Sequence, residues 1–160
     1  MQTYDTQGES LSRKITLFYS YALADKKLRD QLAKHLSPLA LTEEQLIFPG
    51  ESQSQTNALL LDKAELVLLL LSSEYLNSER CKYEMQRALQ RREKDEIHLI
   101  PIILRPCLWE STPLVHISCL PGNKQPVTDW RNRDKAFFEI AQNLSRLIEL
   151  HNHLDNGQQN

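Results

Sequence analysis

The chain has 160 residues, of which 41% are hydrophobic and 25% charged, as expected for one globular domain with its own core. A formal net charge of −2 argues against a general nucleic-acid-binding surface. The chain has three cysteines, Cys81, Cys107 and Cys119. Their odd number and wide spacing argue against a disulfide framework, and they do not have the spacing of zinc ligands. We expect a cytoplasmic protein without a metal, and no apolar run is long enough to span a membrane.

Five short segments rich in β-branched, aromatic or leucine side chains are predicted to form strands. Residues 65–72 (ELVLLLLS) and 97–104 (IHLIPIIL) are continuous apolar runs, a pattern typical of strands buried on both faces of a parallel sheet. Pro101 in the second run predicts a position near the sheet edge or a bulge, because proline has no amide proton to donate. The remaining strands are predicted at residues 14–21, 42–49 and 126–129, the second of them ambiguous.

Amphipathic spacing predicts helices between these strands. Leu28, Leu32 and Leu36, for example, recur every four residues on one helical face. Helices are predicted over residues 25–36, 52–63, 73–93 with a candidate break near Asn77 and Ser78, and 134–150. The predicted domain covers residues 14–151, between flexible tails at 1–13 and 152–160.

Strands that alternate with helices predict an α/β fold, a flavodoxin-like five-stranded parallel sheet in the order 2-1-3-4-5 with helices on both faces. In such a sheet ligands bind beyond the carboxyl ends of the strands, where the strand order reverses. In this chain Ser20, Tyr21 and Ser72 stand at these ends. We find no GxGxxG, GxxxxGK[ST] or GxSxG motif, and no acidic cluster of a phospho-receiver after the first strand.

Glu84 has an unusual place on the predicted helix, at the border of its apolar stripe and about 100° around from Met85. The stripe is predicted to contain Cys81, Met85, Ala88, Leu89 and Arg92. Spacing leaves two alternatives. Glu84 is either a surface carboxylate that pairs with Arg80 or Arg87, or a partly desolvated carboxylate at the rim of a crevice, with a raised pKa.

Five stretches of the chain, in order, resemble the motifs of Toll/interleukin-1 receptor (TIR) domains of the bacterial type. Together they cover about residues 14–150. They are LFYSYALAD (17–25), PGES (49–52), AELVLLLLSSEYLNSERCKYEMQRAL (64–89), LIPIILRPCLW (99–109) and LPGNKQPVTDWRNRDKAFFEIAQNL (120–144).

The resemblance implies two alternative functions. Many bacterial and plant TIR domains hydrolyse NAD+ between nicotinamide and ribose after self-assembly, often in antiviral defence, and their essential glutamate corresponds to Glu84. NAD+ would then be the substrate and no cofactor would be needed. Other TIR domains are non-catalytic adaptors that act in signalling by binding further TIR domains. Pro49 and Gly50 correspond to the loop through which such domains assemble.

Further residues of a substrate pocket are expected from the same resemblance. Phe18, Ser20 and Tyr21 come from the first motif, and Ser72 ends the next strand. Each has an ordinary structural alternative as well: a core ring for Phe18, hydrogen-bonding strand ends or caps for the two serines, and a rim aromatic for Tyr21.

The chain departs from the family pattern in two places. Arg80 stands four residues before Glu84, where catalytic members often carry an aromatic ring. A guanidinium repels the cationic nicotinamide and suits the pyrophosphate better. The segment TEEQLIFPGESQSQ (42–55) also lacks the Trp and Asp that often precede the assembly loop.

Overall fold

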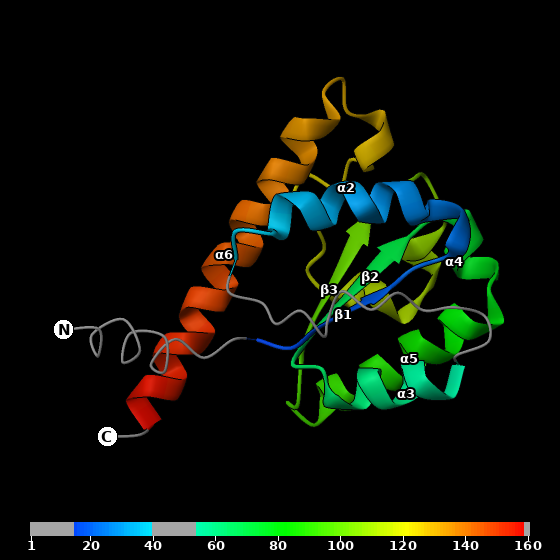
Figure 1. The fold of residues 1–160 in the computed structure, drawn as a ribbon. Helices are drawn as coiled ribbons and strands as arrows, with labels where there is room; N and C mark the ends of the chain where they lie inside the picture. The colour runs from blue at the N-terminus through cyan, green and yellow to red at the C-terminus, as the bar shows by residue number, and fades with distance from the viewer. Residues whose placement is uncertain (1–14, 40–53, 159–160) are drawn as a thin grey trace.

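The computed structural model describes residues 15–39 and 54–158, and three parallel strands form the sheet within them. These strands are β1 (Leu17–Ser20), β2 (Leu66–Leu71) and β3 (His98–Ile103), and they lie side by side in the order β1-β2-β3 (Figure 1). Ser20 pairs with Leu69 and Leu71 with Ile103, so the carboxyl ends of all three strands meet at one edge.

The three strands are the first, third and fourth of those predicted, and their order and direction agree with that part of the predicted sheet. The predicted strand at residues 42–49 lies outside the described residues, so the five-strand order stays a prediction. The strand predicted at 126–129 is wrong, because Val127–Asp129 is a 3-10 helix, η6. The amide of Asp129 bonds to the carbonyl of Pro126 (2.9 Å), which closes a turn and prevents a strand ladder. Leu120 instead makes a single parallel bridge beside Ile102.

Pro101 lies in β3 with its missing amide proton on the side away from β2. The amides of His98 and Leu104 bond to carbonyls on the β2 side, whereas the amide of Ile103 bonds to Leu120 (2.8 Å). Because successive amides of a strand alternate in direction, position 101 faces the same way as position 103. The predicted place of this proline near the sheet edge is confirmed for the described part of the sheet.

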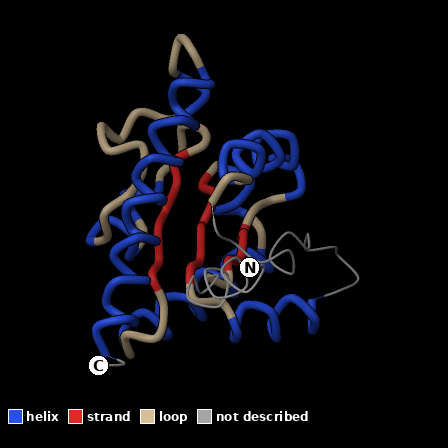
Figure 2. Tube along the Cα trace, turned by 60° about the vertical axis from the view of Figure 1, so that its left-hand side comes forward, coloured by secondary structure: helices blue, strands red, loops and turns tan. Residues whose placement is uncertain are grey.

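Helices cover both faces of this sheet. The helices α2 (Lys26–Leu36), which follows the short η1 (Leu23–Asp25), and α6 (Arg133–Gln158) lie on one face. The other face carries α3 (Ser54–Lys63), α4 (Ser73–Asn77) and α5 (Glu79–Glu93) (Figure 1). Figure 2 shows the strands between the two helical layers. Short 3-10 turns, η4 (Trp109–Ser111) and η5 (Pro113–His116), lie in the loop after β3.

Alternation along β1 divides its side chains between two apolar clusters. Tyr19 and Tyr21 pack with residues of α2 and α6, whereas Phe18 packs with α3 and α5. Ser20 therefore points to the α5 side. Every residue of β2 is buried, as its continuous apolar pattern predicts.

The last helix is longer than its apolar pattern predicts. It ends at Gln158 and so includes residues predicted to form a tail. Just beyond the predicted end the helix contacts the sheet, where Nδ1 of His151 lies 3.3 Å from Nε2 of His98. Among the helices of the described residues, none combines the length and apolar character needed to cross a bilayer.

Candidate functional site

The break between α4 and α5 sets the direction of the helix that carries Glu84. Ser72 caps α4 by accepting a hydrogen bond from the amide of Tyr75 (3.1 Å), and Ser78 caps α5 by accepting one from the amide of Cys81 (3.2 Å). The backbone of Ser78 is extended, so the chain leaves one helix and starts the next. The break predicted near this position is confirmed.

Glu84 lies on the buried face of α5. Its exposed fraction is 2%, and the buried residues of this helix are Cys81, Glu84, Met85, Ala88 and Arg91. The predicted stripe with Arg92 is therefore wrong at its end, because Arg91 is the buried arginine. Its guanidinium donates to the carbonyls of Leu61 and Ala64, which draws this side of the helix inward.

A buried chain of hydrogen bonds reaches Glu84 from two other elements. The hydroxyl of Ser20, at the end of β1, donates to Oε1 of Glu84 (2.7 Å). The hydroxyl of Tyr75, in α4, lies 2.8 Å from the same serine oxygen. Since the serine proton is directed at Glu84, the tyrosine is the donor in the second bond. Tyr75 thus fixes the orientation of Ser20, and Ser20 fixes one oxygen of Glu84.

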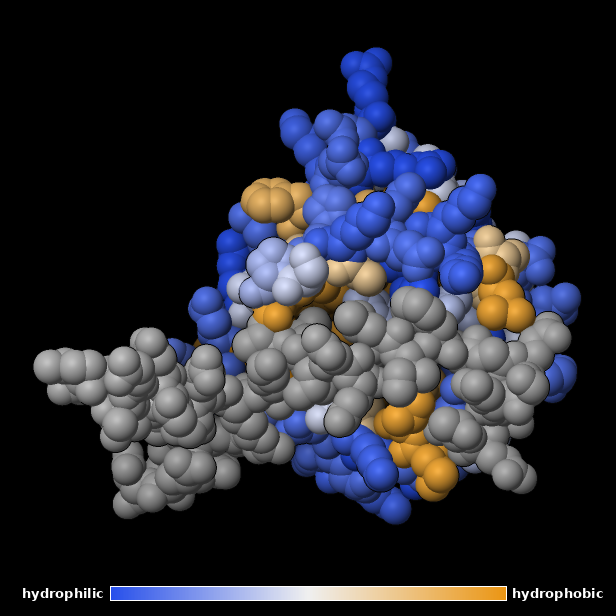
Figure 3. Space-filling view, in the orientation of Figure 1, coloured by the Kyte–Doolittle hydropathy of each residue, from blue (hydrophilic) through white to orange (hydrophobic). Residues whose placement is uncertain are grey.

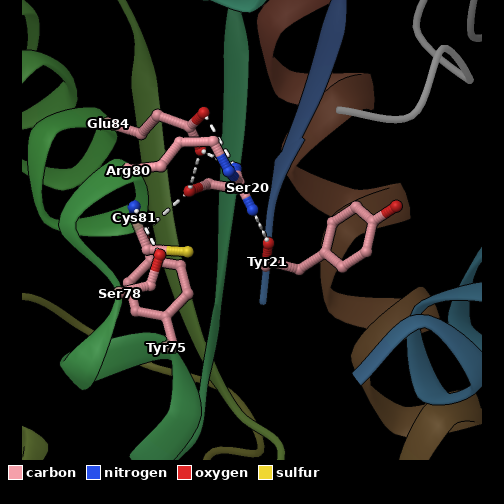
Figure 4. Close-up of polar contacts among 7 residues, drawn as sticks. All are labelled: Ser20, Tyr21, Tyr75, Ser78, Arg80, Cys81 and Glu84. Atoms are coloured by element: carbon pink, nitrogen blue, oxygen red, sulfur yellow. Dashed lines mark hydrogen bonds and ion pairs between the residues drawn. The ribbon is translucent and has the colours of Figure 1, made fainter. Parts of the chain in front are cut away.

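Arg80 binds the other side of the carboxylate (Figure 4). Its Nη1 lies 3.1 Å from Oε1 and 3.0 Å from Oε2 of Glu84, and its Nη2 donates to the carbonyl of Tyr21 (2.8 Å). The pair is an i, i+4 ion pair, as in the surface alternative, but it is largely withdrawn from water. Arg87 instead pairs with Asp62.

Burial dominates the electrostatics of this group. Desolvation raises the pKa of Glu84 above its ordinary value, and Arg80 and the Ser20 hydrogen bond offset part of that effect. Burial is the largest single effect on Arg80 and lowers its pKa, but the Glu84 carboxylate together with Cys81 and Tyr75 outweighs it, so the pKa is raised. Burial also raises the pKa of Tyr75 well above its usual range, so its hydroxyl keeps its proton. The site therefore presents a costly buried anion whose charge is balanced by one cation.

Ser72 belongs to a second polar cluster at the same edge of the sheet. Its hydroxyl donates to Asp25, which is 1% exposed, and Nε of Arg105 bonds to the other oxygen of Asp25 (2.8 Å). This cluster ties the turn after β1 to the segments after β2 and β3. Its hydrogen bonds position the backbone around the candidate site.

The predicted site residues separate into three groups. Ser20, Arg80 and Glu84 come together in direct contact. Phe18 is buried in the apolar cluster on the α5 side of the sheet. The ring of Tyr21 points away from Glu84 toward the opposite helical layer, so that only its carbonyl contributes (Figure 4). Pro49 and Gly50 lie outside the described residues.

A cavity of about 380 Å³ opens beside this group, and Arg80 is the member of the group that borders it. The other lining residues come from the turn after β1 and from α4 and the start of α5: Ala22, Leu23, Ala24, Glu74, Asn77 and Ser78. A wider hollow of about 840 Å³ lies between α2 and the start of α6 and contains none of the predicted site residues. The described surface over that region is strongly hydrophilic (Figure 3).

Three polar residues of this region, Tyr75, Asp25 and Arg105, are not predicted as site residues from the sequence. Tyr75 has the spacing of a core aromatic, and nothing in that spacing shows that its hydroxyl meets Ser20 from 55 positions earlier. Asp25 and Arg105 are 80 positions apart, so only the fold brings them together. The described residues contain no group of three metal-ligating side chains that could hold an ion.

Comparisons with known proteins agree on one family. A family model described as TIR domain matches residues 17–144. A protein of Sinorhizobium fredii (strain NBRC 101917 / NGR234), named "Uncharacterized protein y4lF", is 35% identical over 133 residues, which is 79% of this chain and 41% of that protein. The chain thus spans about two fifths of the length of this bacterial relative.

The fold is also similar to a solved structure, the TIR domain of the Toll-related receptor TRR-2 from Hydra magnipapillata. The TM-score is 0.57 at 20% sequence identity, and the match covers 85% of this chain and 99% of that chain. At this identity the similarity concerns the fold alone.

Proposed function

The chain belongs to the TIR domain family, and on that premise we propose that it hydrolyses NAD+ at the bond between nicotinamide and ribose, with Glu84 as the catalytic carboxylate. The observation that carries this proposal is a carboxylate that is only 2% exposed, bonds to Ser20 at the carboxyl end of β1, and pairs with Arg80, which lines a cavity. A buried acid with a raised pKa at this edge of a parallel sheet is typical of a functional site.

The chemistry suits a single carboxylate. When the C1′–N bond breaks, its electron pair leaves with nicotinamide, which departs as a neutral molecule from a cationic substrate. Positive charge develops on the ribose, and the Glu84 carboxylate stabilises it through space. A water molecule then adds to C1′ and releases one proton, so that NAD+ and water give ADP-ribose, nicotinamide and H+.

The neighbours of Glu84 have positioning roles in this scheme. Ser20 holds Oε1 in place, and Tyr75 holds Ser20, so the carboxylate needs little rearrangement when charge develops. The low polarity of the surroundings strengthens the attraction between the carboxylate and the ribose cation. NAD+ enters this reaction as substrate, and the chemistry requires no metal or cofactor.

Self-assembly is the second half of the proposal. TIR domains commonly bind other TIR domains, and we propose that clustering activates this one, with Pro49 and Gly50 in the assembly loop. We also propose a role in bacterial immune or anti-phage signalling, as the resemblance to bacterial TIR domains implies, and the relative at 35% identity comes from a bacterium.

The direct test compares NAD+ cleavage by the wild type and Glu84→Gln over a concentration series and when clustered on a surface. We expect the substitution to lower nicotinamide release about a hundredfold or more, because it removes the stabilising charge. Glu79→Gln is the matched control, since this residue of α5 has a side chain 92% exposed and pairs with Lys82 on the helix surface. Intact NAD+ after incubation with clustered wild type would disprove the proposal.

The alternative is a non-catalytic TIR adaptor. It is favoured by the hydrogen bonds of Glu84, which occupy both carboxylate oxygens within the protein. With both of its oxygens bonded within the protein, Glu84 makes contacts that a purely structural residue also makes. The adaptor predicts oligomers that form with rising concentration, are lost on substitution of Pro49 or Gly50, and leave NAD+ intact.

A further inference from the structure

Arg80 occupies the face of Glu84 that a substrate has to reach. Its guanidinium lies within 3.1 Å of both carboxylate oxygens, and Ser20 takes the remaining direction at Oε1. A planar cation therefore already stands where the cationic ribose must stand during cleavage. In this arrangement Glu84 is closed to any ligand.

Arg80 also separates Glu84 from the cavity. The cavity of about 380 Å³ is lined by Arg80 but by neither Glu84 nor Ser20. The side chain of Arg80 keeps 19% of its surface exposed, in contrast to 2% for Glu84. Its long, flexible stem allows the guanidinium to turn from the carboxylate to the cavity without a change in the backbone.

Movement of Arg80 breaks three hydrogen bonds, two to Glu84 and one to the carbonyl of Tyr21. Two of these bonds join opposite charges, so the guanidinium leaves only if another anion receives it. The anionic part of NAD+ is its diphosphate, which arginine binds in a bidentate manner. The positively charged nicotinamide riboside part of NAD+ can then replace the guanidinium at Glu84.

We propose, building on the proposed NAD+ hydrolysis, that Arg80 is an internal blocking cation of Glu84 and the specificity-determining residue of this site. The substrate diphosphate binds Arg80 in the cavity and thereby uncovers Glu84. The exchange keeps the charges balanced, because one cation leaves the carboxylate as another arrives. Substrates with a nicotinamide–ribose bond but no phosphate do not release Arg80 and are cleaved poorly.

The cavity wall attracts a diphosphate through Arg80, and one acidic residue, Glu74, opposes that attraction. Among the described lining residues, Glu74 is the one acidic side chain and Arg80 the one basic side chain. Glu74 is exposed, so water and salt screen its repulsion of a diphosphate. The amino end of α5, at Ser78, adds a weak attraction for an anion at the same wall.

A kinetic test compares NAD+ with nicotinamide riboside as substrates of the clustered full chain. The wild type is expected to prefer NAD+ in kcat/KM by about tenfold or more, the value of one charge-assisted hydrogen bond. In Arg80→Ala we expect KM for NAD+ to rise, cleavage of nicotinamide riboside to increase, and the preference to disappear. Arg80→Lys restores part of it. A merely structural role of Arg80 would lower both activities in proportion, and that result would overturn the proposal.

A second readout does not depend on catalysis. Carbodiimide with an added amine modifies accessible carboxyl groups, and mass spectrometry of peptides reports the modification at Glu84. We expect Glu84 to resist modification in the wild type, to react at least about tenfold faster in Arg80→Ala, and to become reactive in the wild type when inorganic pyrophosphate is added. Arg87→Ala is the matched control, because Arg87 lies on the same helix and pairs with Asp62 instead.

The two readouts separate failure of this inference from failure of the proposed function. Modification of Glu84 that follows the expected pattern without NAD+ cleavage would leave the blocking role of Arg80 standing and remove the enzyme proposal. Equal modification in the wild type and Arg80→Ala overturns the blocking role whatever the activity. Circular dichroism checks the fold of each variant, and Arg80→Gln replaces Arg80→Ala if the latter does not fold.

Discussion

At the scale of single residues, the ionisation of Glu84 links the candidate site to the stability of the fold. Burial raises its pKa above the ordinary value of 4.5, so the folded chain holds this proton at pH values where the unfolded chain has lost it. The folded state therefore binds more protons than the unfolded state in that interval. Stability consequently falls as the pH rises through it, opposite to the usual behaviour of a salt-bridged carboxylate.

We predict that Glu84→Gln removes this pH dependence. The free energy of unfolding of the wild type, minus that of the variant, should decrease as the pH rises above 4.5 and become constant above the raised pKa. Urea unfolding of both proteins over a pH series measures the difference. A difference that grows with pH would show that Arg80 lowers the pKa more than burial raises it.

Individual residues also show the limits of a helical pattern. The spacing on the helix places Glu84 at the border of the apolar stripe, and the structure places it inside. Arg91 lies on the same buried face, and its guanidinium bonds to two carbonyls near the end of α3. Helical spacing assigns Arg92 to this face, because it contains no information on the carbonyls of another element that bind Arg91 instead.

At the scale of elements, the junction of α4 and α5 holds two serines with the same local role and different surroundings. Ser72 and Ser78 both cap a helix, but Ser72 also donates to the buried Asp25. The two serines therefore look alike in the sequence, as helix caps, but contribute differently to the stability of the fold. The cap positions can be read from the chain, whereas the contact of Ser72 depends on the neighbouring β1 turn.

We predict that Ser72→Ala destabilises the protein more than Ser78→Ala. Loss of either cap costs about 1 kcal/mol, and Ser72→Ala also removes a donor from a buried carboxylate, for a total of about 2–4 kcal/mol. Chemical unfolding of the two variants provides the comparison, with Ser78→Ala as the internal control. Equal destabilisation would mean that Arg105 alone satisfies Asp25.

At the scale of the whole molecule, polar groups lie at both edges of the sheet. Ser20 and Ser72 stand at the carboxyl ends of the strands with the candidate site, whereas Glu65 and His98 stand at the amino ends. There His151 of α6 lies 3.3 Å from His98 and 3.6 Å from Glu65. The second cluster fastens the end of α6 to the sheet, far along the strands from Glu84.

This second cluster is predicted to weaken in acid. Burial, followed by the charge of His151, lowers the pKa of His98, and Glu65 offsets part of this shift. With a folded pKa below its ordinary value of 6.5, His98 contributes stability above that value, and this is lost as the pH falls. His98→Gln should therefore reduce the change in melting temperature with pH between about pH 5 and 7. His116→Gln, at an exposed histidine of η5, is the control and should retain the slope.

The sequence by itself determines the elements that repeat a local pattern. The three described strands, the break at Ser78 and the edge position of Pro101 all follow from burial, capping and the missing amide of proline. It also predicts Ser20, Arg80 and Glu84 as site residues, two of them on one helix. It is wrong at residues 126–129, where a 3-10 turn replaces the predicted strand, and it ends the last helix too early.

Only the tertiary structure decides how these residues are related to one another. It joins Ser20 to Tyr75 and Glu84, turns the ring of Tyr21 to the opposite layer, and places Arg80 between Glu84 and the cavity. These relations depend on hydrogen bonds between groups 55 to 64 positions apart in the chain. Local periodicity carries no information on such pairs, because it fixes the face on which a side chain lies but not the group that it meets there.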